Sequence, residues 1–162
     1  MIRKILLLGN PGLYKKSEIV SSDELEDMKV IEKDLHDTMM EYRRIHHAGR
    51  AIAAPQIGIH KRILYMNVGE PVLFINPVLE FPDDETMEVM DDCMSFPHLI
   101  VKVERHKRCR IYYRDRNWKE CRVDLEGDLS ELLQHEYDHL DGILATMRAL
   151  DSRSFYYALE KD

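Results

Sequence analysis

The chain has 162 residues, of which 44% are hydrophobic and 33% are charged, and its formal net charge is −7. This size predicts one globular domain over residues 1–162, and the composition is that of an ordinary folded protein rather than of a disordered chain. Binding to a phosphate backbone requires clustered Lys and Arg, so the acidic balance argues against a direct nucleic-acid partner.

The apolar start of the chain indicates a cytoplasmic protein, and the cysteine content argues against a disulfide scaffold. The run "ILLLGNPG" at residues 5–12 is too short to span a bilayer and lacks the features of an export signal. Cys93, Cys109 and Cys121 are an odd number of cysteines in a chain without such a signal, so a disulfide scaffold is not expected. We expect no membrane contact and at least one free thiol.

A long amphipathic helix is predicted between Asp23 and Gly49. Asp23 and Glu26 form a potential capping pair at its start, and Gly49 is a suitable residue to end it. Apolar residues recur at steps of three or four and describe one helical face. They are Leu25, Met28, Ile31, Leu35, Met39, Tyr42 and Ile45.

The middle of the chain, from Ile63 to Ile111, is predicted to form strands. Short β-rich runs such as "RILYMN", "VLFINP" and "HLIVKVE" are separated by Gly, Pro and Asp. Residues 109–125 then resemble a hairpin around a turn at Asp115 to Asn117.

A second helix is predicted over residues 127–142, "GDLSELLQHEYDHLDG". Asp128 and Glu131 have the spacing of a capping box, and Gly142 is a plausible end. Leu129, Leu132, Leu133 and Leu140 supply the apolar face. The predicted fold class is α+β, with small mixed or antiparallel sheets packed around this late helix and with the amphipathic helix preceding them.

The late helix contains His-Glu-x-x-His, a candidate metal-hydrolase pattern. His135 and His139 lie one helical turn apart on one face, where two imidazole nitrogens can converge on a cation. Glu136 flanks that site and can take a proton from a water on the metal. The alternative is a solvated helix face, because five-residue patterns also recur by chance.

A third metal ligand is more plausible upstream than downstream. Only 20 residues follow Gly142, and Glu160 lies almost at the end of the sequence. Cys93, within "EVMDDCMSFP", can complete a Cys-His-His set suited to Zn²⁺ or Fe²⁺. Its alternative role is that of a small buried hydrophobe, which we prefer for Cys109 and Cys121 because these face each other across the predicted hairpin.

The segment "GRAIAAPQIG", Gly49 to Gly58, is a third candidate part of the site. Gly49 permits a sharp exit from the first helix, and Pro55 keeps the chain extended. Gln56 would then be a rigidly held amide that can donate a hydrogen bond to a developing oxyanion. A simple turn between a helix and a strand explains this segment equally well.

Together these segments resemble the peptide deformylase family. "GRAIAAPQIG" matches the family's Gly-x-Gly-φ-Ala-Ala-x-Gln, "DDCMS" matches Glu-Gly-Cys-Leu-Ser, and "QHEYDHLDG" matches Gln-His-Glu-x-Asp-His-Leu-x-Gly. Family-like features also occur at "LLLGNPGL", at "FINP" and at Arg105, so the resemblance covers nearly the whole chain.

The resemblance implies an α+β metallohydrolase that removes the N-formyl group from the initiator methionine of nascent polypeptides and releases formate. Cys93, His135 and His139 would hold one divalent metal ion, Fe²⁺ in cells with Zn²⁺, Ni²⁺ or Co²⁺ tolerated. Glu136 would move protons, while Gln56 and the Met94 N–H would stabilise the oxyanion. Gly49 and Ala51 would line the path of the substrate. The expected partners are N-formyl-methionyl peptides or nascent chains, with the ribosome as a candidate partner.

The sequence departs from the family pattern at several positions near this site. Ala51 replaces a Gly and adds a methyl group where substrate is expected to pass. Asp91 replaces a Glu that commonly pairs with the Arg represented by Arg105, and Met94 replaces a Leu. Asp92 replaces a Gly, so we expect strain if that position requires a positive φ, and its charge favours a cation over an oxyanion.

Three functions therefore compete. The leading hypothesis is an active deformylase. The second is a deformylase-like hydrolase that acts on a different N-acyl or amide substrate. The third is a non-catalytic metal-binding paralogue, which would hold metal without turnover on any acyl peptide.

Overall fold

The computed structural model describes residues 1–158, so Glu160 lies outside the described residues. Within this range the chain forms two α-helices, four short 3-10 helices and eight strands. The α-helices are α1 (Leu25–His46) and α2 (Asp128–Leu140). The 3-10 helices are η1 (Pro11–Tyr14), η2 (Ser22–Glu24), η3 (Ala54–Ile57) and η4 (Ala145–Arg148).

The strands form two antiparallel sheets. The larger has five strands in the order β1-β2-β3-β6-β7, and the smaller has three in the order β4-β5-β8. Their bounds are β1 (Ala51–Ala53), β2 (Ile63–Asn67), β3 (Pro71–Glu80), β4 (Thr86–Asp91), β5 (Leu99–His106), β6 (Arg108–Arg114), β7 (Glu120–Glu126) and β8 (Phe155–Tyr157). The predicted central strands are confirmed, whereas β1 and β8 were not predicted.

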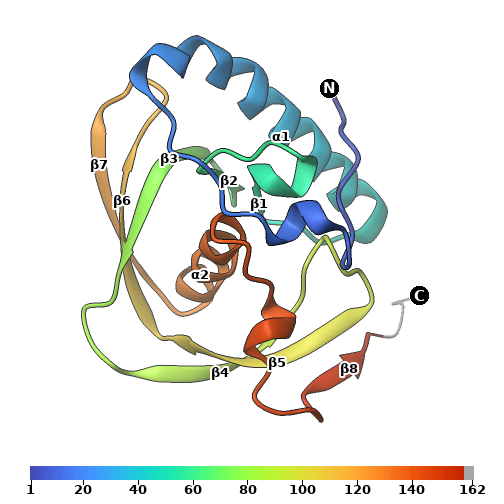
Figure 1. Ribbon diagram of the computed structural model, residues 1–162. Helices are drawn as coiled ribbons and strands as arrows, with labels where there is room; N and C mark the ends of the chain where they lie inside the picture. The colour runs from blue at the N-terminus through green and yellow to red at the C-terminus, as the bar shows by residue number, and fades with distance from the viewer. Residues whose placement is uncertain (159–162) are drawn as a thin grey trace.

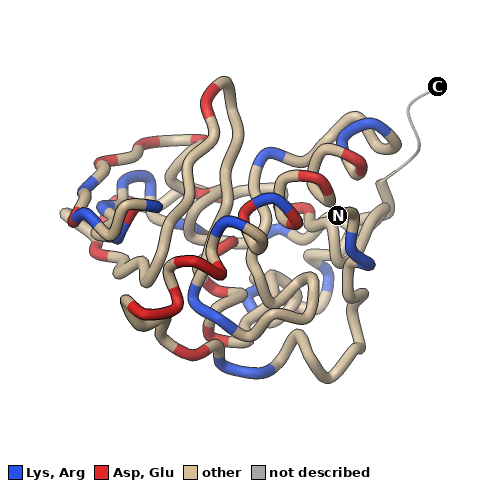
Figure 2. Tube along the Cα trace, turned by 90° about the horizontal axis from the view of Figure 1, so that it is seen from above, with Lys and Arg blue, Asp and Glu red and all other residues tan. Residues whose placement is uncertain are grey.

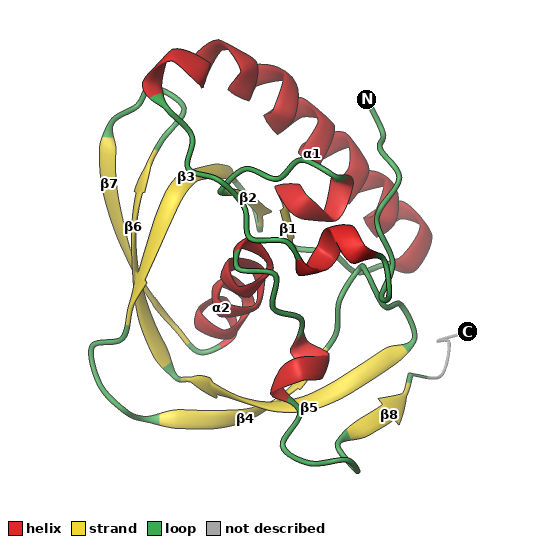
Figure 3. Ribbon diagram, viewed as in Figure 1, coloured by secondary structure: helices red, strands yellow, loops and turns green. Residues whose placement is uncertain are grey.

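Helix α2 occupies the centre of the molecule (Figure 1). The five-stranded sheet curves around one side of it, β4 and β5 pass beneath it, and α1 covers the remaining side (Figure 3). The α+β prediction, with sheets packed around a late helix and an early amphipathic helix, is confirmed. Because α2 is enclosed, polar side chains on it are removed from water and need partners within the protein.

Helix α1 confirms the first predicted helix, but its ends differ from the prediction. The start uses Ser21 and Glu24 instead of Asp23 and Glu26, with the Ser21 N–H donating to the Glu24 carboxylate at 3.1 Å. At the other end, the C-cap residue is His47 instead of Gly49, and it takes the left-handed conformation with φ 55°. Ile45 is 53% exposed, because the last turn of α1 extends beyond the core residues.

Helix α2 is also confirmed, without the predicted capping box. The helix begins at Asp128 after Gly127, and no side chain caps it. Asp128 is already inside the helix, the N–H of the N-cap residue Gly127 donates to the Lys107 carbonyl at 2.8 Å, and the Glu131 carboxylate accepts from Arg50 at 3.3 Å. The helix ends at Leu140, and Gly142 follows with φ +71°, as expected for a glycine beyond a C-terminus.

The predicted hairpin is formed by β6 and β7, but its two cysteines are not opposite each other. Cys109 pairs with Leu125 and Cys121 pairs with Tyr113, so the thiols lie toward different ends of the hairpin. All three cysteines are free. Cys109 is buried among apolar residues, which confirms its interpretation as a small hydrophobe, whereas Cys121 is only partly buried.

Two apolar clusters flank the central helix. One packs α1 against β2 and η3 through residues such as Met28, Leu35 and Ile63, and the other packs α2 against the larger sheet through residues such as Phe74 and Leu133. Charged residues of both signs are interspersed along the trace (Figure 2). No helix within residues 1–158 is long and apolar enough to cross a membrane.

Gly142 is a position where a side chain should not be tolerated. A β-carbon there would overlap the carbonyl oxygen of Tyr14, and φ +71° disfavours any L side chain. We expect Gly142→Ala to lower the free energy of unfolding by about 3 kcal/mol or more, measured by urea denaturation. Gly58→Ala is the control, because φ is +82° with open space around it, and should cost only about 1 kcal/mol. Equal losses in the two variants would contradict the proposed overlap.

Candidate functional site

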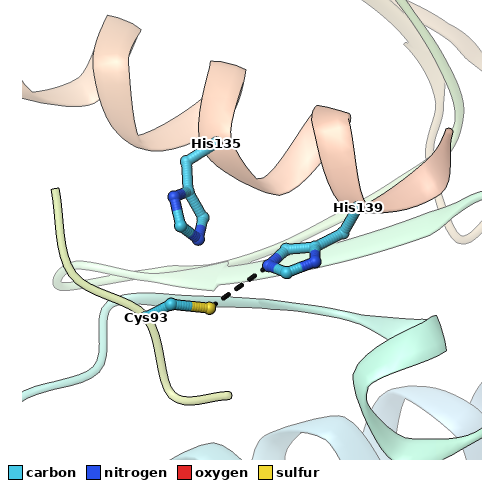
Figure 4. Close-up of side chains that lie close together, drawn as sticks. All are labelled: Cys93, His135 and His139. Atoms are coloured by element: carbon cyan, nitrogen blue, oxygen red, sulfur yellow. Dashed lines mark hydrogen bonds between the residues drawn. The ribbon is translucent and has the colours of Figure 1, made fainter. Parts of the chain in front are cut away.

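The predicted metal ligands converge at the centre of the molecule (Figure 4). His135 and His139 project from successive turns of α2, and Cys93 approaches from the loop between β4 and β5. The ligand atoms of the three side chains lie within 4.8 Å of one another, with the Cys93 Sγ 3.3 Å from the His139 Nε2. All three residues are buried. Helix periodicity therefore places the imidazoles, and the loop between two strands of the smaller sheet supplies the thiol.

Asp91 fixes the orientation of His135. The His135 Nδ1 donates to the Asp91 Oδ2 at 3.0 Å, and the Arg105 Nη2 donates to the same oxygen at 2.8 Å. The expected pairing of the shorter Asp91 with Arg105 is thus confirmed. Burial works to raise the pKa of Asp91, but His135 and Arg105 outweigh it and lower this pKa to about 2. A permanently ionised Asp91 keeps the Nδ1 proton in place and turns Nε2 toward Cys93 and His139.

The residues present fit a divalent metal ion. A thiolate and two imidazoles are the ligands that Zn²⁺, Fe²⁺ and similar ions accept. The His135 Nε2 is buried without a hydrogen-bond partner among the described residues, and a cation between the three ligand atoms would satisfy it. Burial also lowers the pKa of His139 well below its usual value, which favours the neutral imidazole that metals bind. Together with the family, this cluster supports one bound metal ion.

Glu136 presents a buried carboxyl group to the same region. It follows His135 on α2 and is 4% exposed, and its Oε2 has no partner within residues 1–158. Burial raises the pKa of Glu136 to about 7, with the Asp91 and Asp92 carboxylates adding to the shift. A carboxyl with a pKa near neutrality can both accept and return a proton.

Gln56 is held rigidly beside the thiol, as predicted. Its Oε1 accepts the Ala53 N–H at 2.9 Å, which determines the orientation of the amide. Its Nε2 then donates to the Ser95 Oγ at 3.1 Å and to the Cys93 Sγ at 3.5 Å. The Ser95 N–H approaches the same sulfur at 3.4 Å. The sulfur is therefore surrounded by donors, which stabilise negative charge on it.

A cleft of about 330 Å³ opens beside Cys93 and Glu136. The Met94 side chain lies in its wall, and none of the described residues accepts a hydrogen bond from the Met94 N–H. Gly49 and Ala51 line the same cleft. Gly49 and Ala51, which the sequence predicts to bind substrate, thus lie in the same cleft as Cys93, Met94 and Glu136.

The two glycine replacements are accommodated without backbone strain. Ala51 is 2% exposed, and its methyl group packs in the apolar cluster between α2 and the larger sheet. Asp92 does not have a positive φ, so the expected strain at this position is absent. Its side chain is exposed and lines the cleft, where its charge rather than its conformation is the difference from the family pattern.

Sequence reasoning missed several residues that support the site. Ser95 follows the cysteine by two positions and orients Gln56. Asp138 accepts hydrogen bonds from Arg105 at 2.7 Å and from Arg148 at 2.6 Å. The position of Asp138 between the two histidines was a usable signal, because a buried helix face rarely carries an unpaired carboxylate. Arg148 carried no comparable signal, since its partner could not be inferred from spacing.

Comparisons with known proteins agree with this geometry. The family model described as polypeptide deformylase matches residues 2–154. A peptide deformylase of Thermotoga maritima is 37% identical over 142 residues, which cover 87% of this chain and 83% of that protein. A peptide deformylase of Treponema pallidum is 35% identical over 151 residues, covering 93% of this chain and 90% of that protein.

A solved structure extends the similarity to the fold. The crystal structure of the Thermotoga maritima peptide deformylase superimposes with a TM-score of 0.85 at 34% identity, covering 93% of this chain and 99% of that one. The family model's match over residues 2–154 includes both α-helices, strands β1 to β7 and the loop that carries Cys93. The chain belongs to the polypeptide deformylase family.

Proposed function

We propose that this chain hydrolyses the N-formyl amide of the initiator methionine of nascent polypeptides and releases formate. The observation that carries the proposal is the buried Cys93, His135 and His139 cluster with the Glu136 carboxyl beside it, in a chain of the deformylase family. The reaction takes place in the cytoplasm, where new chains are made. Docking to the ribosome is a further part of the proposal.

One divalent ion is required, and we propose Fe²⁺ as the ion in cells. Cys93, His135 and His139 would hold it, and a single thiolate with two imidazoles also suits Zn²⁺. When bound there, a divalent ion supplies Lewis acidity, which acidifies a water molecule and polarises the formyl carbonyl. The thiolate makes the site sensitive to oxidation, so activity should depend on exclusion of oxygen.

The residues around the ion would transfer the proton and stabilise the developing negative charge. Glu136 accepts the proton of the attacking water and later donates it to the leaving amine, which balances the conversion of formamide and water into formate and amine. The Gln56 Nε2 and the Met94 N–H donate to the oxygen that becomes negative. The 3.5 Å hydrogen bond from Gln56 to the Cys93 sulfur is the weaker of its two donations, so it is the one that Gln56 would give up to donate to the substrate oxygen. Gly49 and Ala51 border the path of the peptide.

The first test measures formate release from a formyl-Met peptide by anaerobically prepared protein loaded with Fe²⁺. We expect turnover on the formyl peptide to exceed turnover on an acetyl-Met peptide of the same sequence, with the metal content near one ion per chain. Preferential turnover of another acyl peptide would identify a hydrolase of different specificity. One ion per chain with no turnover on any acyl peptide would identify a metal-binding paralogue.

Glu136→Gln tests the proton carrier without changing the size of the side chain. We expect metal content and thermal stability to be retained, while kcat for formate release falls about 10²-fold to 10⁴-fold, because the amide cannot move the proton. Metal analysis on the same preparation is the control. Full activity in this variant would remove Glu136 from the mechanism and overturn the assignment.

Asp92→Asn tests the effect of a negative charge beside the oxyanion. The Asp92 carboxylate disfavours negative charge developing in the cleft, so we expect its removal to raise kcat/KM for formyl-Met peptides about 2-fold to 5-fold at low salt. The gain should shrink in 0.5 M salt, roughly as screening predicts. Asp92→Gly separates charge from bulk, since a further gain beyond the Asn variant would mean that the side chain obstructs the peptide. An unchanged or lower kcat/KM in both variants would contradict the charge effect.

A further inference from the structure

A continuous chain of charged side chains runs from the surface to a metal-ligating imidazole. The Arg148 Nε and Nη2 donate to the two oxygens of Asp138 at 2.6 and 2.9 Å. Asp138 also accepts from the Arg105 Nη1 at 2.7 Å, and the Arg105 Nη2 donates to Asp91 at 2.8 Å. Asp91 in turn holds the Nδ1 of His135 at 3.0 Å. Positive and negative groups alternate from Arg148 to Asp91, which holds the imidazole.

This chain of charged side chains is exposed only at its outer end, Arg148, and is buried from Asp138 inward. The Arg148 side chain is 44% exposed, Asp138 is 10% exposed, and Arg105, Asp91 and His135 are 3–4% exposed. Arg148, Asp138 and Arg105 line a cavity of about 350 Å³ against a different face of α2 from the one that bears His135. The inner ion pairs are shielded from water, so their electrostatic interactions are stronger than those of pairs on a surface. Loss of one charged partner therefore affects the neighbouring pair more strongly than it would on a surface.

We propose that Arg148 is a positioning residue for the metal centre, acting through Asp138, Arg105 and Asp91 on the ring of His135. Arg148 contacts both oxygens of the Asp138 carboxylate and shares the Oδ2 with Arg105, so the two guanidinium groups together balance its charge. Without Arg148, the single guanidinium of Arg105 must serve two buried carboxylates, and its hydrogen bond to Asp91 weakens. Asp91 then holds the His135 ring less firmly, and the Nε2 is less accurately directed toward the ion.

The backbone near Arg148 is anchored independently of its side chain. Ala149 forms an antiparallel bridge with Val103, and the Leu150 N–H donates to the Lys102 carbonyl at 3.2 Å. Removal of the Arg148 guanidinium should therefore leave η4 in place against β5. The effect of such a substitution is then expected at the metal centre and not only in the global stability.

The test measures Co²⁺ binding by Arg148→Met, Arg148→Lys and the unsubstituted protein under anaerobic conditions. Loss of a residue that orients a ligand directly weakens metal binding about 10-fold to 100-fold, so we expect about 3-fold to 10-fold weaker binding for Arg148→Met, which acts three residues further out than Asp91. The visible absorption bands of bound Co²⁺ should change, because they report ligand geometry. Arg148→Lys should be intermediate, since it keeps the charge but not the two-point contact.

Arg62→Met is the matched control. Arg62 pairs with Asp141 at 2.9 Å and with the Leu140 carbonyl at 3.1 Å, at the same end of α2, but has no contact with Asp138. We expect this variant to lower the melting temperature and leave the Co²⁺ spectrum and affinity unchanged. If Arg148→Met behaves in the same way, Arg148 is only structural and the proposal is wrong.

A double-mutant cycle tests whether the effect passes through Asp91. In an Asp91→Asn background the chain is already interrupted, so Arg148→Met should add little further loss of Co²⁺ affinity. Additive losses would mean that Arg148 acts by another route and would overturn the proposal. The inference rests on the metal site of the proposed function but not on its substrate. A protein that binds Co²⁺ and releases no formate would contradict deformylation while leaving this test intact.

Discussion

The structure depends on the enclosure of α2, a helix that carries polar groups into the centre of the protein. A buried polar atom without a partner costs free energy, so each such atom on this helix constrains another segment of the chain. Ser130 and Gln134 bond to the His106 backbone, His135 to Asp91, and Asp138 to two arginines. Two of the buried atoms that lack a partner within residues 1–158, the His135 Nε2 and the Glu136 Oε2, belong to the site where a metal ion and a reacting substrate are expected. The same helix therefore carries the buried polar groups that need partners for folding and the groups that the proposed chemistry uses.

Local patterns predicted the helices, the hairpin and the chemistry of the site. The spacing of His135 and His139 is informative because helix geometry alone brings them together, whatever surrounds the helix. Helix ends were less predictable: Ser21 and Glu24 cap the turn that leads into α1, and at the start of α2 the N-cap N–H of Gly127 bonds to the Lys107 carbonyl while Glu131 bonds to Arg50. Contacts between distant segments, such as Arg148 with Asp138, depend on the path of the whole chain and leave no periodic signal.

The departures from the family pattern differ in consequence. Asp91, in place of the family's Glu, keeps the hydrogen bonds of this position, because Arg105 and His135 both reach the shorter carboxylate. Ala51 places its methyl group in the core. Asp92 remains as an exposed charge at the edge of the cleft, so the Cys93, His135 and His139 cluster is preserved while the charge that lines the cleft differs from the family pattern. Divergence in this chain therefore affects the approach to the site more than the site itself.

The position of Cys93 also has a consequence for folding. Cys93 and His139 are 46 residues apart, and the chain between them contains β5, the β6–β7 hairpin and most of α2. An ion shared by these two residues is a reversible cross-link that closes a long loop. By analogy with a disulfide over the same loop, it would restrict the unfolded chain by about 4 kcal/mol. Metal supply would then influence how much of this protein survives in the cell, in addition to how fast it works.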